Sequence, residues 1–173
     1  RALDAFLTSQ RTEIAERIER NAAHLAKRPA DDAAWWDAKK WDAALLDILR
    51  PFYVRTHDEV ARVGGILAGK AAPLAVGTGS ASMAERIAAD ATLRRILGML
   101  GTRVTRINAT TRDLIRAAIS AGLDLGEGAA DLGKRIAAAA AFDEYRGELI
   151  ARTETMFAWN GSAIESYRDL GVE

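Results

Sequence analysis

The chain contains no cysteine, only three prolines and few aromatic residues, which make up 6% of its 173 residues. Without cysteine there are no disulfides, thiolate metal sites or thiol catalysis, as expected for a protein that folds in a reducing cytoplasm. No run of 18 or more apolar residues occurs and no signal-peptide pattern opens the chain, so we expect a soluble protein with no membrane partner. The first residue is an arginine, which indicates a fragment of a longer protein.

Charge of one sign is also lacking, because 24 lysines and arginines balance 24 aspartates and glutamates. No global electric field therefore attracts nucleic acid or a membrane surface, and any binding must be local. The length is enough to bury a core, as one domain or two small ones.

Every apolar run repeats with the period of an α-helix, and no alternating strand pattern occurs. The sequence predicts an all-α fold, an elongated or bundle-like array of about six helices joined by short Gly/Pro turns. The expected helices cover about residues 3–27, 33–50, 51–68, 92–121, 129–141 and 142–172, with a further short helix from Ser80 or Ser82 through Ala88.

Three of the four tryptophans lie close together, at positions 35, 36 and 41. This apolar load must be buried within the fold or against a neighbour. Pro51 follows the same helix and is expected to kink or restart it.

Gly69 to Ser82 is rich in Gly, Ala, Ser and Pro and has no periodicity, which is typical of a linker or long loop. It lacks the spacing of a phosphate-binding loop. We therefore divide the chain into a helical region 1–70, a linker 71–82 and a second helical region 83–173.

No pattern of catalytic or metal-binding residues is present. His24 and His57 are far apart, and neither has an acidic residue or a histidine at ligand spacing. The acidic residues nearly all have a basic residue within one helical turn, as on solvated helices. We predict no enzyme activity, no cofactor and no metal.

The last long stretch, Phe142 to Val172, has a polar interruption in its apolar side. That side is formed by Phe142, Tyr145, Leu149, Met156, Phe157, Ala163, Ile164 and Tyr167. Thr153 and Asn160 fall near its middle, with Arg152 at its edge and Glu154 pointing away. We predict that Thr153 and Asn160 are buried and form hydrogen bonds to the helix around 108–116. The alternative is a threonine bonded to its own backbone and an edge asparagine.

Two sequence motifs, which occur in a fixed order along the chain, resemble those of a known family. Ile150-Ala-Arg-Thr-Glu154 is followed by Trp159-Asn160-Gly161, and a tyrosine precedes Gly171-Val172. Upstream, Asn108-Ala-Thr-Thr111 precedes Ile115 and Ile119 and a glycine-rich turn at 122–126. Over about residues 91–173 the chain resembles the phage head-morphogenesis family, minor head proteins similar to the F protein of phage Mu.

The chain differs from the family pattern at two points, and another part of it shows a second, weaker resemblance. Gly128 stands where the family usually has a serine, and the chain stops at Glu173, before the polar segment that the family commonly continues into. Any chemistry of that segment cannot be carried over. Residues 30–70 resemble the helical C-terminal region of some phage portal proteins.

The resemblance implies a structural component of a tailed-phage or prophage head. Its expected partners are portal or capsid proteins, packaged DNA without sequence preference, and further copies of itself. Its expected location is the virion, and the host cytoplasm during assembly. Arg152, Thr153, Glu154 and Asn160 would then be architectural. The alternatives are a helical carrier domain of a larger enzyme or effector, and a general helical interaction domain.

One local concentration of positive charge occurs, because no acidic residue lies between Ala91 and Arg112. The arginines there are Arg94, Arg95, Arg103, Arg106 and Arg112. Helical geometry places them away from the apolar side. They predict either a solvated face that pairs with Glu148 or Glu154, or a contact with packaged DNA or an acidic partner.

Overall fold

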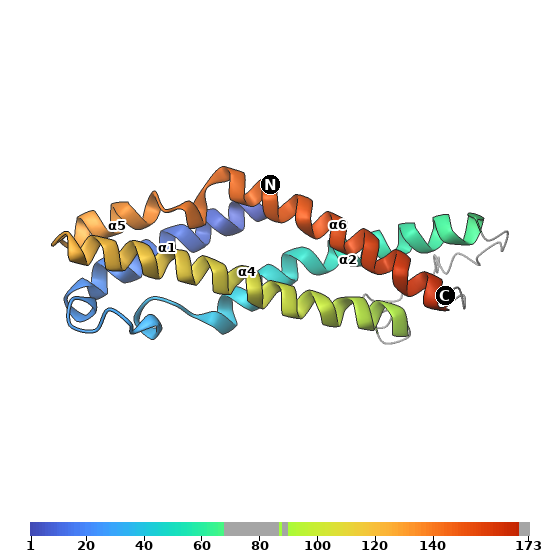
Figure 1. Cartoon of the computed structure of the whole chain (residues 1–173), viewed down its shortest axis with the longest axis horizontal. Helices are drawn as coiled ribbons and strands as arrows, with labels where there is room; N and C mark the ends of the chain where they lie inside the picture. The colour runs from blue at the N-terminus through green and yellow to red at the C-terminus, as the bar shows by residue number, and fades with distance from the viewer. Residues whose placement is uncertain (68–86, 88–89, 170–173) are drawn as a thin grey trace. The chain divides into compact units, whose positions relative to one another are not determined.

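The computed structural model describes residues 1–67, 87 and 90–169 and confirms the all-α prediction, since these residues form helices and turns with no strand (Figure 1). The five α-helices of this part are α1 (Ala2–Leu25), α2 (Ala38–Leu67), α4 (Ala91–Asp124), α5 (Ala129–Ala137) and α6 (Glu144–Asp169). Two short 3-10 helices, η1 (Asp32–Ala34) and η2 (Ala140–Phe142), precede α2 and α6. The expected number was about six. The linker 71–82, and all but Ile87 of the short helix expected to end at Ala88, lie outside the described residues.

The chain divides into two compact units. The first unit is Arg1–Leu45 with Arg103–Ala151, and the second unit is Leu46–Thr102 with Arg152–Glu173. Each unit takes residues from both of the regions 1–70 and 83–173, because α2, α4 and α6 each contribute one part to each unit. The units therefore cut across the division predicted from the linker.

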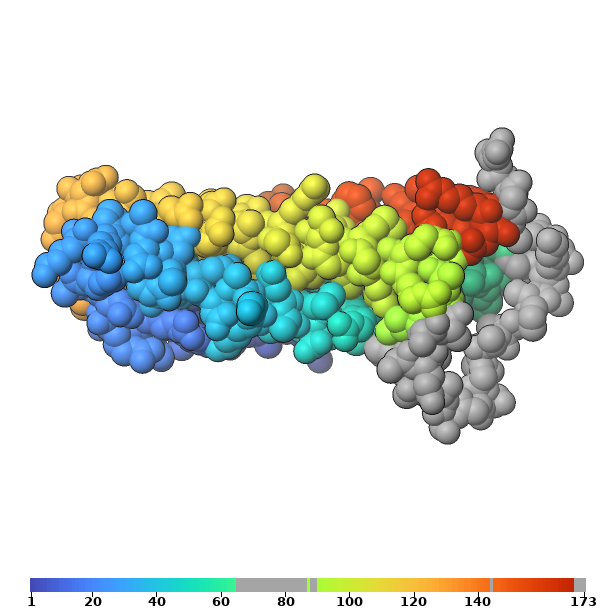
Figure 2. Space-filling view, turned by 90° about the horizontal axis from the view of Figure 1, so that it is seen from below, coloured from blue at the N-terminus to red at the C-terminus, as the bar shows by residue number. Residues whose placement is uncertain are grey.

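In the first unit α1 packs along α5, and one side of α1 is buried. Its buried residues are Phe6, Leu7, Gln10, Ile14, Ile18 and Leu25. The segment between α1 and α2, blue in Figure 2, lies against the yellow part of α4. Trp35, Trp36 and Trp41 are all buried here, as predicted, and Trp41 meets Phe6 edge-on with ring centres 6.1 Å apart.

Of the two outcomes predicted at Pro51, a kink or a restart of the helix, the restart is wrong, because α2 is continuous from Ala38 to Leu67 with Pro51 inside it. The helix also begins later than expected: Asp37 accepts a hydrogen bond from the backbone N–H of Lys40 at 3.0 Å and caps it. Proline removes one backbone hydrogen bond. Burial of Leu49, Tyr53 and Val54 on either side of it offsets that loss.

The core of the second unit comes from apolar residues of α2, α4 and α6. These include Leu49, Tyr53, Val54, Val60, Leu93, Ile96, Leu100 and Ala158. Leu93, Ile96 and Leu100 lie on the inner side of α4 and are almost completely buried.

Glycines end α4 as predicted. Gly126 has a φ of 71°, a left-handed conformation that favours glycine, and Glu127 N–H donates to the carbonyl of Gly122 at 2.9 Å. Gly128 then occupies the N-cap of α5. Within α4, Gly98 faces open space, since a Cβ added there would meet no atom within 4 Å. No neighbouring helix explains this glycine.

The inner and outer faces of α6 are the reverse of the prediction. Asn160 is exposed and Thr153 is only partly buried, whereas Glu154, predicted to point away, is 1% exposed. The expected core residues are outside: Tyr145, Leu149, Met156, Phe157, Ile164 and Tyr167 are each at least half exposed. Small residues and carboxylates form the inner face instead: Gly147, Ile150, Glu154, Ala158, Ser162 and Glu165. The small side chains allow close approach, and the carboxylates find donors on other helices.

Candidate functional site: polar contacts of the motif helices

The Asn108 to Thr111 motif lies in the interior of the first unit. Asn108 is 2% exposed and Thr111 is 1% exposed. The Asn108 amide nitrogen donates to Asp42 Oδ1 at 2.8 Å, and its oxygen accepts a long contact from the Gln10 amide at 3.5 Å. Asn108 therefore links α4 to α1 and α2. A buried amide bonded on both sides favours one register over its neighbours, because a shifted helix would leave it unpaired.

Thr111, at the end of this motif, connects α4 to α6 through Arg146. Arg146 Nη2 donates to the Thr111 hydroxyl at 2.7 Å and to the carbonyl of Ile107 at 3.2 Å. The Thr111 hydroxyl donates to the same carbonyl at 3.0 Å. Burial lowers the pKa of the Arg146 guanidinium below its ordinary value. Arg146 thus joins α6 to α4 through neutral oxygens in these contacts.

The carboxylate of Glu154, in the Ile150 to Glu154 motif, is held within the second unit. The hydroxyl of Tyr53 on α2 donates to Glu154 Oε2 at 2.7 Å, and Tyr53 is 2% exposed. Arg152, in the same motif, is exposed. The motif therefore divides into an inner glutamate and an outer arginine.

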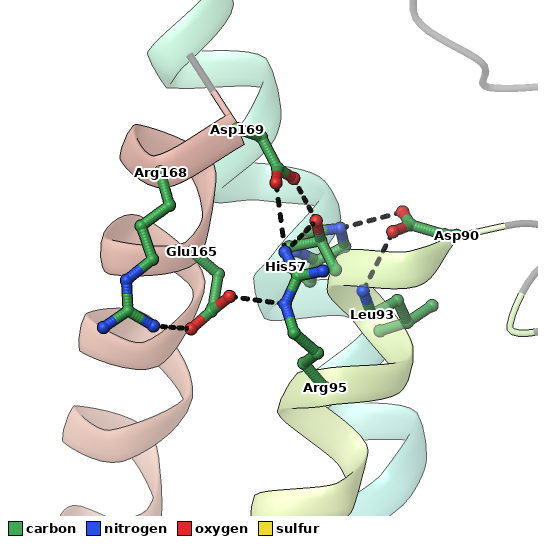
Figure 3. A network of polar contacts seen from close by, with 8 residues as sticks. His57, Asp90, Leu93, Arg95, Glu165, Arg168 and Asp169 are labelled. Atoms are coloured by element: carbon green, nitrogen blue, oxygen red, sulfur yellow. Dashed lines mark hydrogen bonds and ion pairs between the residues drawn. The ribbon is translucent and has the colours of Figure 1, made fainter. Parts of the chain in front are cut away.

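A network of ion pairs joins α4 to the end of α6 in the second unit (Figure 3). Arg95 Nε donates to Glu165 Oε2 at 2.6 Å, and Arg95 Nη2 donates to Asp169 Oδ1 at 3.0 Å. Arg168 donates to the other oxygen of Glu165 at 2.6 Å, and the Thr92 hydroxyl donates to Asp169. The hydrogen bond from Arg95 lowers the pKa of Glu165 against the opposing effect of burial, and the charge of Arg168 adds to it. Glu165 is therefore an anion at neutral pH.

His57 joins this region from α2. Its Nε2 lies 3.1 Å from Asp90 Oδ2, and its side chain is 7% exposed (Figure 3). Asp90 also accepts the Leu93 N–H at 2.9 Å and so caps α4. Burial raises the pKa of Asp90, but the bonds from Leu93 and His57 outweigh it and hold that pKa below its ordinary value. The Nε2 of His57 is thus satisfied by Asp90, while its Nδ1 has no partner among the described residues.

Arg95 and Arg112, which were among the arginines predicted to meet DNA, pair with carboxylates. Arg95 binds Glu165 and Asp169, and Arg112 lies 3.1 Å from Asp113 and 3.7 Å from Asp32. For Arg95 and Arg112 these carboxylates differ from Glu148 and Glu154, the two that one interpretation expected. Arg94 and Arg106 are exposed and Arg103 is partly buried. Arg94 and Arg95 belong to the second unit, and Arg103, Arg106 and Arg112 belong to the first.

The first unit carries an open depression, and the described residues hold no metal site. One open depression of about 600 Å³ lies between α4 and α5 in the first unit, lined by Glu127, Lys134 and Arg135 among others. Its charges are neutralised locally, since Arg135 pairs with Glu127 and Lys134 with Asp131. No three metal-ligating side chains come together in the part of the chain that the structure describes. Nor does any helix of that part have the length and apolar character to span a membrane.

Comparison of the chain with protein-family models, with curated proteins and with solved structures found no match. Sequence reasoning also missed several partners of the motif residues, chiefly Gln10, Asp42, Tyr53 and Arg146. Of these residues, Gln10 was the easiest to find from the sequence, because it lies on the buried side of α1 between Leu7 and Ile14. A polar residue in that position signals a buried partner.

Proposed function

We propose that the protein is a structural component of a tailed-phage or prophage head, a minor head or portal-associated protein that acts in head morphogenesis. The proposal starts from the resemblance of residues 91–173 to the head-morphogenesis family. The observation that supports it most is the placement of the motif side chains. Asn108, Thr111 and Glu154 are buried and bridge helices, as architectural residues would.

The arrangement of charge supports an architectural role over a reaction centre. A general acid or base must reach its substrate, whereas the Glu154 carboxylate is buried against the Tyr53 hydroxyl. Glu165, the other buried carboxylate of α6, is neutralised by Arg95 and Arg168. Within the proposal, the partners are portal or capsid proteins and packaged DNA, and the location is the virion after assembly in the host cytoplasm.

Copurification tests this proposal. The full-length protein is expressed together with the portal and capsid proteins encoded beside it, and procapsids are separated by sedimentation. We expect the protein to sediment with procapsids in few copies per particle. A protein that stays entirely in the soluble fraction, with a catalytic domain in the same reading frame downstream, would instead support the helical carrier of an enzyme or effector.

A matched pair of variants connects the test to the motif. Asn108→Ala removes the buried link between α1, α2 and α4, and we expect it to reduce incorporation into procapsids through loss of folding. Asn160→Ala changes an exposed motif residue. If incorporation depends on the motif only through folding, Asn160→Ala leaves it unchanged, and a loss with unchanged helicity would place Asn160 at the contact.

A further inference from the structure

The outer face of α6 in the second unit carries an uncommon density of exposed apolar side chains. Met156 is 64% exposed, Ile164 and Tyr167 are each 52%, Phe157 is 50% and Trp159 is 46%. At 100° per residue these five fall within an arc of about 160°. Met99 of α4, 46% exposed, extends the face, since a Cβ on Gly161 would lie 3.6 Å from its methyl carbon. We call these six residues the α6 face.

The area of the α6 face matches what a stable dimer requires. A side chain of this size has roughly 200 Å² to bury, so six that are about half exposed offer on the order of 600 Å². A standard interface buries about 800 Å² on each partner, a little more than half of it apolar. The six residues supply that apolar share, and Asn160 and Ala163 between them contribute further surface. A patch of this size is at the upper end of what monomers expose, and such patches are often functional.

The charges around the α6 face point to an uncharged partner. Among the charged residues from 152 to 169 of α6, only Arg152 lies within the apolar arc. Glu154 and Glu165 are buried, and Arg168 and Asp169 lie outside the arc. Nucleic acid and anionic lipid are recognised by clustered basic residues, which the face lacks. A second copy of this chain, which has no net charge, meets no such barrier.

We propose that the α6 face forms a homodimer in which two α6 helices pack antiparallel around a twofold axis near Asn160. In a parallel pair the two Arg152 side chains would stand side by side within the apolar contact. In the antiparallel pair they lie about 25 Å apart along the axis, well beyond the screening length of about 8 Å. A twofold contact also uses the same face on both copies, as an isologous dimer requires. The proposal does not depend on the assignment to a phage head.

Sedimentation equilibrium over a range of protein concentrations tests the dimer. We expect the wild-type chain to reach twice its 18.7 kDa mass. Met156→Lys places a charge in the face and raises the dissociation constant at least about tenfold. Leu125→Lys is the matched control, because Leu125 is a more exposed apolar residue, 71%, in the first unit. A wild-type monomer at all concentrations overturns the proposal, as does equal weakening by both variants.

Engineered cysteines test the orientation, and the natural absence of cysteine makes each one unique. Asn160→Cys lies near the proposed axis and should form an intermolecular disulfide on mild oxidation. Tyr167→Cys lies about 20 Å from its copy in the antiparallel pair and should not. Equal cross-linking of both variants would show a parallel pair. Cross-linking of neither variant would show that another surface holds the dimer.

Discussion

The hydroxyl of Tyr53 donates a hydrogen bond to the Glu154 carboxylate, which is almost completely buried. We expect Tyr53→Phe to destabilise the protein by about 1–3 kcal/mol, because Glu154 loses a hydrogen bond that water cannot easily replace. Urea denaturation followed by circular dichroism measures the change. Tyr145→Phe is the control, since Tyr145 is 65% exposed and its loss should cost close to nothing. Equal effects of the two variants would mean that the buried hydrogen bond contributes no stability.

Glu165 makes the stability of the protein depend on pH in the acid range. Its pKa is lowered in the folded state, so its contribution is complete above the ordinary glutamate pKa of about 4.3 and is lost as the pH falls through the lowered value. Asp90 acts in the same direction. We therefore expect the urea midpoint to fall between about pH 5 and pH 3.

Glu165→Gln should flatten this acid dependence while lowering stability at pH 7, because the ion pairs with Arg95 and Arg168 are lost. Glu16→Gln, a change of the same kind at an exposed position of α1, should leave the acid profile as in the wild type. An unchanged profile for Glu165→Gln would show that the ion-pair network of Figure 3 does not respond to pH.

Two glycines of α4 predict opposite outcomes for the same substitution. Gly98→Ala should stabilise the protein by about 0.5–1 kcal/mol, because the new methyl group meets nothing and alanine favours the helix. Gly122→Ala should destabilise it by about 1–3 kcal/mol. There a Cβ would lie 2.5 Å from Leu132 Cδ2, on a leucine that is only 1% exposed. Thermal unfolding of both variants provides the comparison, and stabilisation by Gly122→Ala would contradict the packing of α5 on α4.

The helices themselves could be predicted because local periodicity and capping define them. The ranges of α1, α4 and α5 agree with expectation to within a few residues. Pro51 shows the limit of this approach. Tyr53 and Val54, which follow it in α2, are buried by other parts of the fold, and this packing keeps the helix continuous.

The orientation of α6 could not be predicted, because two of its faces could be buried and hydrophobicity favours the wrong one. The choice depends on partners that are distant in the chain, Tyr53 for Glu154 and Arg95 for Glu165. A sequence predicts that a carboxylate is exposed unless the hydrogen-bond donor that pairs with it is known. The candidate site was therefore predicted in part: the motif sequence pointed to buried polar side chains in α6, but assigned Thr153 and Asn160 where Glu154 and Glu165 are found.

For the whole molecule, zero net charge leaves DNA binding to local clusters. We expect weak binding to duplex DNA, without sequence preference and steeply weakened by salt. Replacing Arg95, Arg103 and Arg106 by alanine should flatten the salt dependence. The ion pairs of Arg95 reduce its share, so Arg106→Ala alone should have a larger effect than Arg95→Ala. Fluorescence anisotropy over a salt series measures these slopes, and identical binding of wild type and triple variant at low salt would exclude the contact.

The distribution of tryptophans gives the natural protein two optical signals. Trp35, Trp36 and Trp41 are shielded inside the first unit, and Trp159 is 46% exposed in the second. The fluorescence of buried indoles lies at shorter wavelength than that of solvent-exposed indoles, and iodide quenches it less. During denaturation, a red shift of the main emission therefore follows the first unit, while iodide quenching of the remaining component follows the environment of α6. One unlabelled sample can thus report on the two units separately, with Trp159→Phe to assign the component that iodide quenches.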